Sequence, residues 1–132
     1  MKRLITCTDG TWDQPGDKVD GKSIDSNVCL FYTAVREKDD FGIQQLKFYD
    51  TGVGTGYTLE DKLMGGITGA GIDKKIKDAY TFLVLNYEKG DELFFVGFSR
   101  GAYTARSLAG FIRNCGILRP EYLHLVDRAN EL

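Results

Sequence analysis

The sequence predicts an α/β fold with a three-layer α/β/α arrangement around a parallel sheet. Three observations support this prediction. Short strand-like runs alternate with helix-like segments, the helix-like segments carry apolar residues every three to four positions, and glycine-rich turns follow the strands. The 16 glycines, against two prolines, fit turns built on glycine. In such a sheet, ligands bind at the carboxyl ends of the strands.

The first half of the chain predicts two strands and one helix. Residues 3–8 form a short apolar run that stops at a strong Asp-Gly turn signal. A polar loop follows, and we expect Asn27 to cap a short helix. The apolar positions of this helix are Val28, Phe31, Tyr32 and Val35. Residues 46–49 form the second strand, and the glycine-dense segment 52–71 comes after it.

The second half predicts a long helix, a strand and two further helices. The long helix has an apolar face and is expected to end at Gly90. The residues of that face are Ile72, Ile76, Ala79, Tyr80, Leu83 and Tyr87. A strand over 92–96 leads to a helix over 102–114, which Gly116 stops. Pro120 favours the start of the last helix.

The pentapeptide Gly97-Phe98-Ser99-Arg100-Gly101 is the most informative motif of the chain. It joins the third strand to the helix after it, which is the context of a nucleophile elbow. In such a turn the serine is exposed at the carboxyl edge of the sheet. Glycine is needed two residues before and two residues after it, because a Cβ would clash. We therefore expect Ser99 to be the nucleophile, with Gly97 and Gly101 as the elbow glycines.

A serine nucleophile also needs amides that stabilise a developing oxyanion. The Arg100 amide begins the following helix, whose dipole favours negative charge at that end. In hydrolases of this class a second donor comes from a loop after an early strand, and here the Gly10 and Thr11 amides hold that place. The same residues also fit a plain turn over which Trp12 packs, and both interpretations stay open.

Three other motifs are incomplete. The sequence around Gly10 is similar to the D-x-D-G-T motif of phosphatases with an aspartyl nucleophile. In this chain, however, Cys7 occupies the position of that nucleophile. The loop after the second strand would need glycine in place of Tyr57 to bind a dinucleotide. Gly66–Gly71 has phosphate-loop spacing without the required lysine after it. Both loops are expected either to border the serine or to be plain linkers.

Composition excludes several classes of function. A net charge of −2 and a pI near 5.4 give no basic field for nucleic acid. The three cysteines are too widely spaced for a zinc site or a disulfide framework, so we expect reduced thiols, no metal and no cofactor. No apolar run reaches the length of a signal peptide core or a transmembrane segment. The chain is expected to be cytoplasmic, or exported by a route without a signal peptide.

The base that a serine nucleophile requires is not evident. The single histidine, His124, comes after the helix that follows Ser99. That helix leads away from the active edge for roughly 20 Å, so His124 is expected near the opposite edge. In α/β hydrolases the acid and the histidine follow the serine on later strands. No later strand is visible here, and the only acidic residues after Ser99 are Glu121, Asp127 and Glu131.

Four motifs in order resemble one known family. They are DGTW at 9–12, YDTGVGT at 49–55, GITGAG at 66–71 and GFSRGAYTARS at 97–107. The family is the uncharacterised α/β-hydrolase domain family that includes the phospholipase effectors of bacterial type VI secretion systems. The resemblance covers nearly the whole chain. It implies a Ser-Asp-His hydrolase of lipid or phospholipid esters, with Ser99 as the nucleophile and the acid and histidine in a downstream half.

Two functions follow from these observations. In the first, residues 1–132 are a single α/β-hydrolase-like domain, the N-terminal portion of a longer serine hydrolase of esterase or phospholipase type. In the second, the chain is a non-catalytic interaction module, or a pseudoenzyme half that needs a partner chain. In both cases no strand follows the Ser99 helix. We therefore expect an exposed apolar sheet edge that favours self-association or pairing with a complementing chain.

Overall fold

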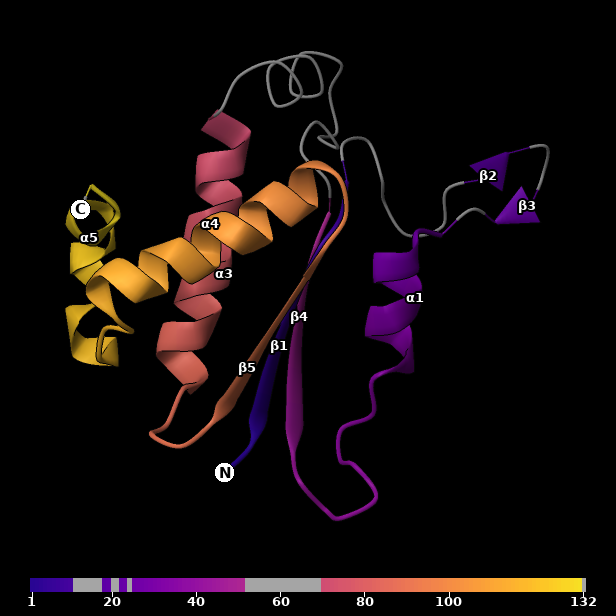
Figure 1. Cartoon of the computed structure of the whole chain (residues 1–132), viewed down its shortest axis with the longest axis horizontal. Helices are drawn as coiled ribbons and strands as arrows, with labels where there is room; N and C mark the ends of the chain where they lie inside the picture. The colour runs from indigo at the N-terminus through magenta and orange to yellow at the C-terminus, as the bar shows by residue number, and fades with distance from the viewer. Residues whose placement is uncertain (11–17, 20–21, 24, 52–69, 132) are drawn as a thin grey trace.

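The computed structural model describes residues 1–10, 18–19, 22–23, 25–51 and 70–131. Its elements are, in order, β1 (Arg3–Thr8), β2 (Lys18–Val19), β3 (Lys22–Ser23), α1 (Asn27–Ala34), β4 (Gln45–Asp50), α3 (Ala70–Asn86), β5 (Glu92–Gly97), α4 (Arg100–Cys115), the 3-10 helix η1 (Pro120–Leu125) and α5 (Val126–Asn130). Figure 1 shows this alternation of strands and helices, as the sequence predicted. The short antiparallel pair β2–β3 was not predicted.

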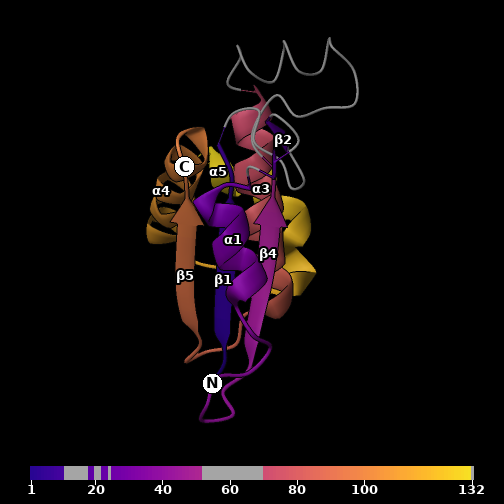
Figure 2. The same cartoon turned by 90° about the vertical axis from the view of Figure 1, so that its right-hand side faces the viewer.

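The central sheet has three parallel strands in the order β4-β1-β5. β1 is the middle strand, and five of its six residues are buried. At the carboxyl edge Thr8 is level with Asp50 of β4 and with Gly97 of β5. Figure 2 shows the three strands side by side, pointing the same way, with α1 in front of them. The α/β class and the parallel sheet are therefore confirmed.

Helices cover both faces of the sheet, with α1 on one side and α3 and α4 on the other (Figure 1). The larger core lies under α3 and α4, where Tyr80 stacks on Phe111 with 4.1 Å between the ring centroids. Burying each such large side chain contributes about 1.5–3 kcal/mol. Under α1 the core is smaller and consists of Ile5, Cys7 and Val28. The layer formed by α3 and α4 therefore packs the larger of the two cores against the sheet.

The boundaries of all four predicted helices differ from the predictions, and α4 begins at Arg100 instead of residue 102. Ser26, and not Asn27, caps α1, because its Oγ accepts a hydrogen bond from the Cys29 amide at 3.0 Å. α3 ends at residue 86, and Gly90, with φ of 97°, lies in the turn to β5. The last helix begins as the 3-10 helix η1 before it becomes α5. The stop of α4 at Gly116 is confirmed.

Candidate active site

The turn between β5 and α4 brings Ser99 to the carboxyl edge of the sheet. Ser99 has φ of 56° and ψ of −122°. Among the residues that the structure describes, no other non-glycine residue has a positive φ. Such a backbone costs about 1–3 kcal/mol and persists only where the surrounding structure imposes it. It turns the chain from strand to helix within two residues and leaves Ser99 exposed.

Hydrogen bonds from β1 hold this turn in place. The Phe98 amide donates to the Thr8 carbonyl at 3.2 Å, which extends the β1–β5 ladder. The Thr8 side chain is buried, and its Oγ1 donates to the Gly101 carbonyl at 2.9 Å. The Ala102 amide donates to the Ser99 carbonyl at 3.0 Å and begins the helix. The middle strand therefore imposes the conformation of Ser99.

Two glycines allow the turn to pack this closely. A Cβ on Gly97 would lie 2.3 Å from the Gly101 carbonyl oxygen. A Cβ on Gly101 would lie 2.2 Å from the Thr8 carbonyl oxygen and 2.5 Å from that of Asp9. These neighbours are backbone atoms, which cannot move aside as a flexible side chain can. The steric need for glycine on both sides of Ser99, expected from the sequence, is met here.

A buried carboxyl group, Asp9, lies beside the turn. Its side chain accepts hydrogen bonds from the Gly10 amide at 3.0 Å, from Ser26 Oγ at 2.6 Å and from the Tyr49 hydroxyl. Ser26 caps α1 and Tyr49 belongs to β4, so Asp9 joins three elements at the carboxyl edge. From the sequence, Asp9 was predicted only to be part of a turn. An Asp-Gly pair contains no signal that the aspartate is buried.

Of the three expected oxyanion donors, Thr11 lies outside the described residues. Arg100 is the first residue of α4, so its amide follows Ser99 directly at the positive end of the helix dipole. The Gly10 amide donates to the carboxyl group of Asp9, so an oxyanion would compete with that group for the Gly10 hydrogen.

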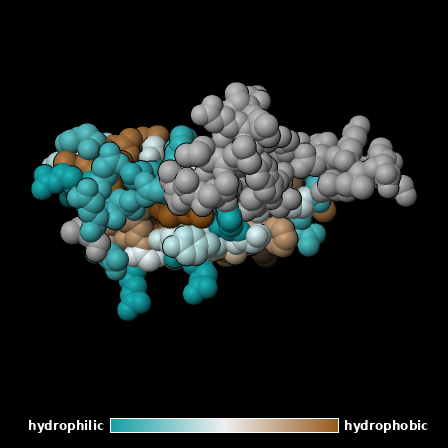
Figure 3. Space-filling model, turned by 90° about the horizontal axis from the view of Figure 1, so that it is seen from above, coloured by the Kyte–Doolittle hydropathy of each residue, from teal (hydrophilic) through white to brown (hydrophobic). Residues whose placement is uncertain are grey.

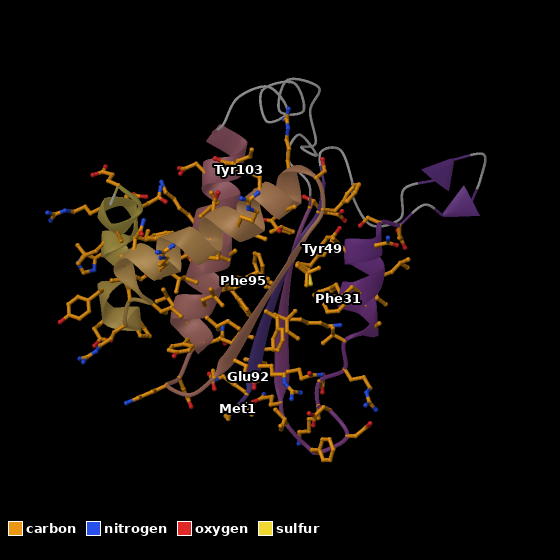
Figure 4. All side chains as sticks on the ribbon, viewed as in Figure 1. Met1, Phe31, Tyr49, Glu92, Phe95 and Tyr103 are labelled. Carbon is orange, nitrogen blue, oxygen red and sulfur yellow. The ribbon has the colours of Figure 1, made fainter. Side chains whose placement is uncertain are left out.

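A pocket of about 590 Å³ opens beside Ser99, between the N-terminal half of α3 and the start of α4. The described residues that line it are Ile72, Asp73, Ile76, Ser99, Arg100 and Tyr103. In Figure 4 the labelled Tyr103 lies near the upper end of α3. Figure 3 looks down on this edge of the molecule and shows hydrophobic surface in brown between hydrophilic residues in teal. The pocket has the size of a small-molecule site.

Two carboxyl groups, Asp50 at the end of β4 and Asp73 in the lining of the pocket, have opposite pKa shifts. Burial raises the pKa of Asp50, although the Lys75 ammonium lies only 2.5 Å away and opposes this shift. The hydrogen bond from Lys77, at 2.9 Å, lowers the pKa of Asp73, and a second one from Asn130, also at 2.9 Å, adds to this effect. Asp73 is therefore a carboxylate that shares the Lys77 ammonium with Asp127, which lies 2.9 Å from the same nitrogen.

No triad partner for Ser99 is found in the described part of the chain. Among those residues, Ser99 Oγ makes no hydrogen bond to a carboxyl group or an imidazole. His124 is exposed and belongs to η1, which follows the C-terminal end of α4 in the chain. The 16 residues of α4 span about 24 Å. The acid and the base that the family resemblance implies are therefore not assigned to described residues.

Other nucleophiles and sites are not evident in the described ranges. Burial raises the pKa of Cys7 to about 11, so its thiol stays neutral and unreactive. Among the described residues, no group of three His, Cys, Asp or Glu side chains is arranged to hold a metal ion. No helix within the same residues has the length and apolar character needed to cross a membrane.

The fold and the geometry at its edge define a class: an α/β protein whose parallel sheet presents a conformationally strained serine beside a pocket. Residues 2–132 match the model of the family described as the type VI secretion system (T6SS) phospholipase effector Tle1-like catalytic domain, and the chain belongs to this family. An uncharacterised protein of Saccharomyces cerevisiae is 31% identical over 141 residues, which cover 97% of this chain and 20% of that relative. The chain thus spans about a fifth of the relative's length. No solved structure matches the chain.

Proposed function

We propose that this chain carries the nucleophile of a serine ester hydrolase that acts on lipid or phospholipid acyl esters. The main support is the backbone of Ser99, which has φ of 56° between two glycines that admit no Cβ. A strand–serine–helix turn of this shape is typical of the nucleophile elbow of α/β hydrolases. Membership of a phospholipase effector family supports the same class of substrate.

In this proposal Ser99 Oγ attacks the acyl carbonyl carbon, and the resulting oxyanion is stabilised by backbone amides. The Arg100 amide is the first donor, and the Thr11 or Gly10 amide is the second. The Ser99 proton must pass to a general base, which later protonates the leaving alcohol. We assign this base to a group outside the described residues or on a second chain.

The alternative function is a non-catalytic interaction module. It is favoured by the edge of the sheet, where β5 pairs with β1 and with no other described strand. Phe94 of β5 is also 46% exposed, and it lines an apolar groove together with Phe31 of α1. Unpaired strand edges are sites of association. Self-association through β5 stays a prediction.

The two functions are distinguished by exposing the chain to a fluorophosphonate and measuring its intact mass. A serine without a base reacts slowly, so rapid formation of one adduct is expected only if Ser99 is activated. Ser99→Ala should abolish the adduct. Ser107→Ala, which removes a partly buried hydroxyl from the same helix, should retain it. A folded wild-type chain that forms no adduct would mean that residues 1–132 alone contain no base that activates Ser99, and would leave the interaction module as the function of this chain by itself.

A further inference from the structure

We infer that the pocket beside Ser99 binds the acyl chain of the substrate, and that Ile72, Ile76 and Tyr103 contact this chain. The inference rests on the proposed function, because the pocket matters for an ester only if Ser99 attacks its carbonyl. It goes further by assigning a chemical class of ligand to particular residues of α3 and α4.

The walls of the pocket are apolar on two sides. Ile72 and Ile76 lie one turn apart on α3, so their side chains share one face of that helix. Ile76 is 9% exposed, and Ile72 packs partly against the main core. Tyr103 comes from the first turn of α4, and this residue is 61% exposed. Two buried or partly buried isoleucines thus face an aromatic ring across an open space of about 590 Å³.

Two of the three polar residues in the described lining of the pocket, Ser99 and Arg100, lie where the ester would be attacked. Ser99 and the start of α4 form one end of the lining. The carboxylate of Asp73 already accepts hydrogen bonds from Lys77, which also pairs with Asp127, and from Asn130 of α5, so its oxygens are engaged away from the ester. A polar end at the serine and an apolar body between two helices match a neutral acyl ester, with its carbonyl at Ser99 and its hydrocarbon against Ile72 and Ile76.

The test measures binding and therefore does not depend on turnover. Pyrenedecanol, an uncharged fluorescent long-chain alcohol, is titrated into the full chain, into Ile72→Glu and into Leu85→Glu. The charge in Ile72→Glu lies in the first turn of α3, where the helix dipole favours it. Leu85→Glu is the matched control, because it makes the same change at an exposed leucine near the other end of α3.

We expect saturable binding by the wild type and by Leu85→Glu, and at least tenfold weaker binding by Ile72→Glu, which corresponds to about 1.4 kcal/mol. Tyr103→Glu, at a largely exposed position, should also weaken binding. Circular dichroism checks that each variant is folded. Equal dissociation constants for the wild type and for both pocket variants would overturn the inference, as would the absence of saturable binding by the wild type.

Failure of this inference is distinguishable from failure of the proposed function. Labelling of Ser99 by a fluorophosphonate reports on the nucleophile, whereas pyrenedecanol reports only on the pocket. Labelling without site-specific pyrenedecanol binding would contradict the acyl pocket and leave the nucleophile in place. Binding that Ile72→Glu abolishes, in a chain that is not labelled, would support a site for acyl chains and contradict hydrolysis by this chain.

Discussion

Two carboxyl groups at opposite edges of the central sheet, Asp91 at the amino edge and Asp9 at the carboxyl edge, are held by different kinds of polar contact. At the amino edge the contacts are ion pairs, such as the Lys2 ammonium at 2.6 Å from the carboxylate of Asp91. Arg3 also forms two ion pairs there, with Asp39 and Glu92. Around the Ser99 turn, the Asp9 carboxyl group is instead bound by hydroxyl groups and a backbone amide.

The backbone differs between the two edges as well. In the described part of the chain, the positive φ of a non-glycine residue and the closest glycine contacts both occur at the carboxyl edge. Strain of this kind persists only where neighbouring structure imposes it, and it concentrates at functional sites. Conformational strain therefore favours the carboxyl edge as the candidate functional edge, independently of the serine motif.

The largest expected effect is that of Gly101→Ala. Its Cβ would meet the carbonyl oxygens of Thr8 and Asp9 within 2.5 Å, so either β1 or the turn must shift. We expect a loss of about 3 kcal/mol or more in the free energy of unfolding, at the upper end of what overpacking costs. Urea denaturation followed by circular dichroism measures this loss.

Gly110→Ala is the matched control on the same helix. Among the residues that the structure describes, no atom outside the helix lies within 4 Å of the Cβ that this change adds. Alanine in a helix interior should therefore stabilise the chain by about 0.5–1 kcal/mol. Equal effects of the two substitutions would show that the tight contact at Gly101 is not a feature of the folded protein in solution.

Smaller losses are expected when the two buried carboxyl groups, Asp91 and Asp9, are each replaced by an amide, and the two losses should differ. The partners of Asp91 are the Lys2 ammonium, which can only donate, and the backbone amides of Lys2 and Glu88. The amide nitrogen of Asp91→Asn would therefore oppose a donor. We expect this variant to lose about 2 kcal/mol in the free energy of unfolding, measured in urea at neutral pH.

Asp9→Asn should cost less, about 1 kcal/mol, because the Tyr49 hydroxyl can reverse its hydrogen bond and accept from the new amide. The Gly10 amide can still donate to the remaining oxygen. A larger loss for Asp9→Asn than for Asp91→Asn would contradict the distinction between Asp91, which is held by an ammonium, and Asp9, which is held by neutral donors.

The sequence was sufficient for the sheet and for the shape of the serine turn, because both depend on local signals. The apolar runs and the spacing of Gly97 and Gly101 are visible within a few residues of each other. The cap of α1 was assigned to the wrong residue, since Ser26 and Asn27 are both good caps. The choice between them depends on Asp9, which accepts from the Ser26 hydroxyl and is distant in sequence.

The candidate site could be predicted only in part for the same reason. Asp9 is buried because Tyr49, forty residues later, lies beside it. Helical spacing predicted Ile72 and Ile76 for the core. That they also border a pocket depends on α4 packing against α3 and bringing Tyr103 opposite them. Periodicity along one segment contains no information on where two segments meet.

The smallest expected effect is a difference in pH dependence between Asp91 at the amino edge and Asp50 at the carboxyl edge. Burial alone would raise the pKa of Asp91, but the Lys2 ammonium and two backbone amides outweigh it, and the pKa is lowered. Its contribution to stability is therefore present above the ordinary value of 3.8 and is lost as the pH falls through its lower folded value. Burial raises the pKa of Asp50 despite Lys75, so its contribution has the opposite sign and is lost as the pH rises through its higher folded value.

Urea denaturation at a series of pH values from about 7 to about 3 tests this difference. The advantage of the wild type over Asp91→Asn should shrink as the solution becomes acidic, because the protonated aspartate no longer pairs with Lys2. Relative to the double variant Asp50→Asn/Lys75→Met, the wild type should instead become more stable as the pH falls from about 7 to about 3. The double variant avoids leaving the Lys75 ammonium without its partner, which would itself be destabilising. Parallel pH profiles for the two comparisons would mean that the Asp50–Lys75 pair behaves like the ion pairs of the amino edge, and the electrostatic distinction between the two edges would then be wrong.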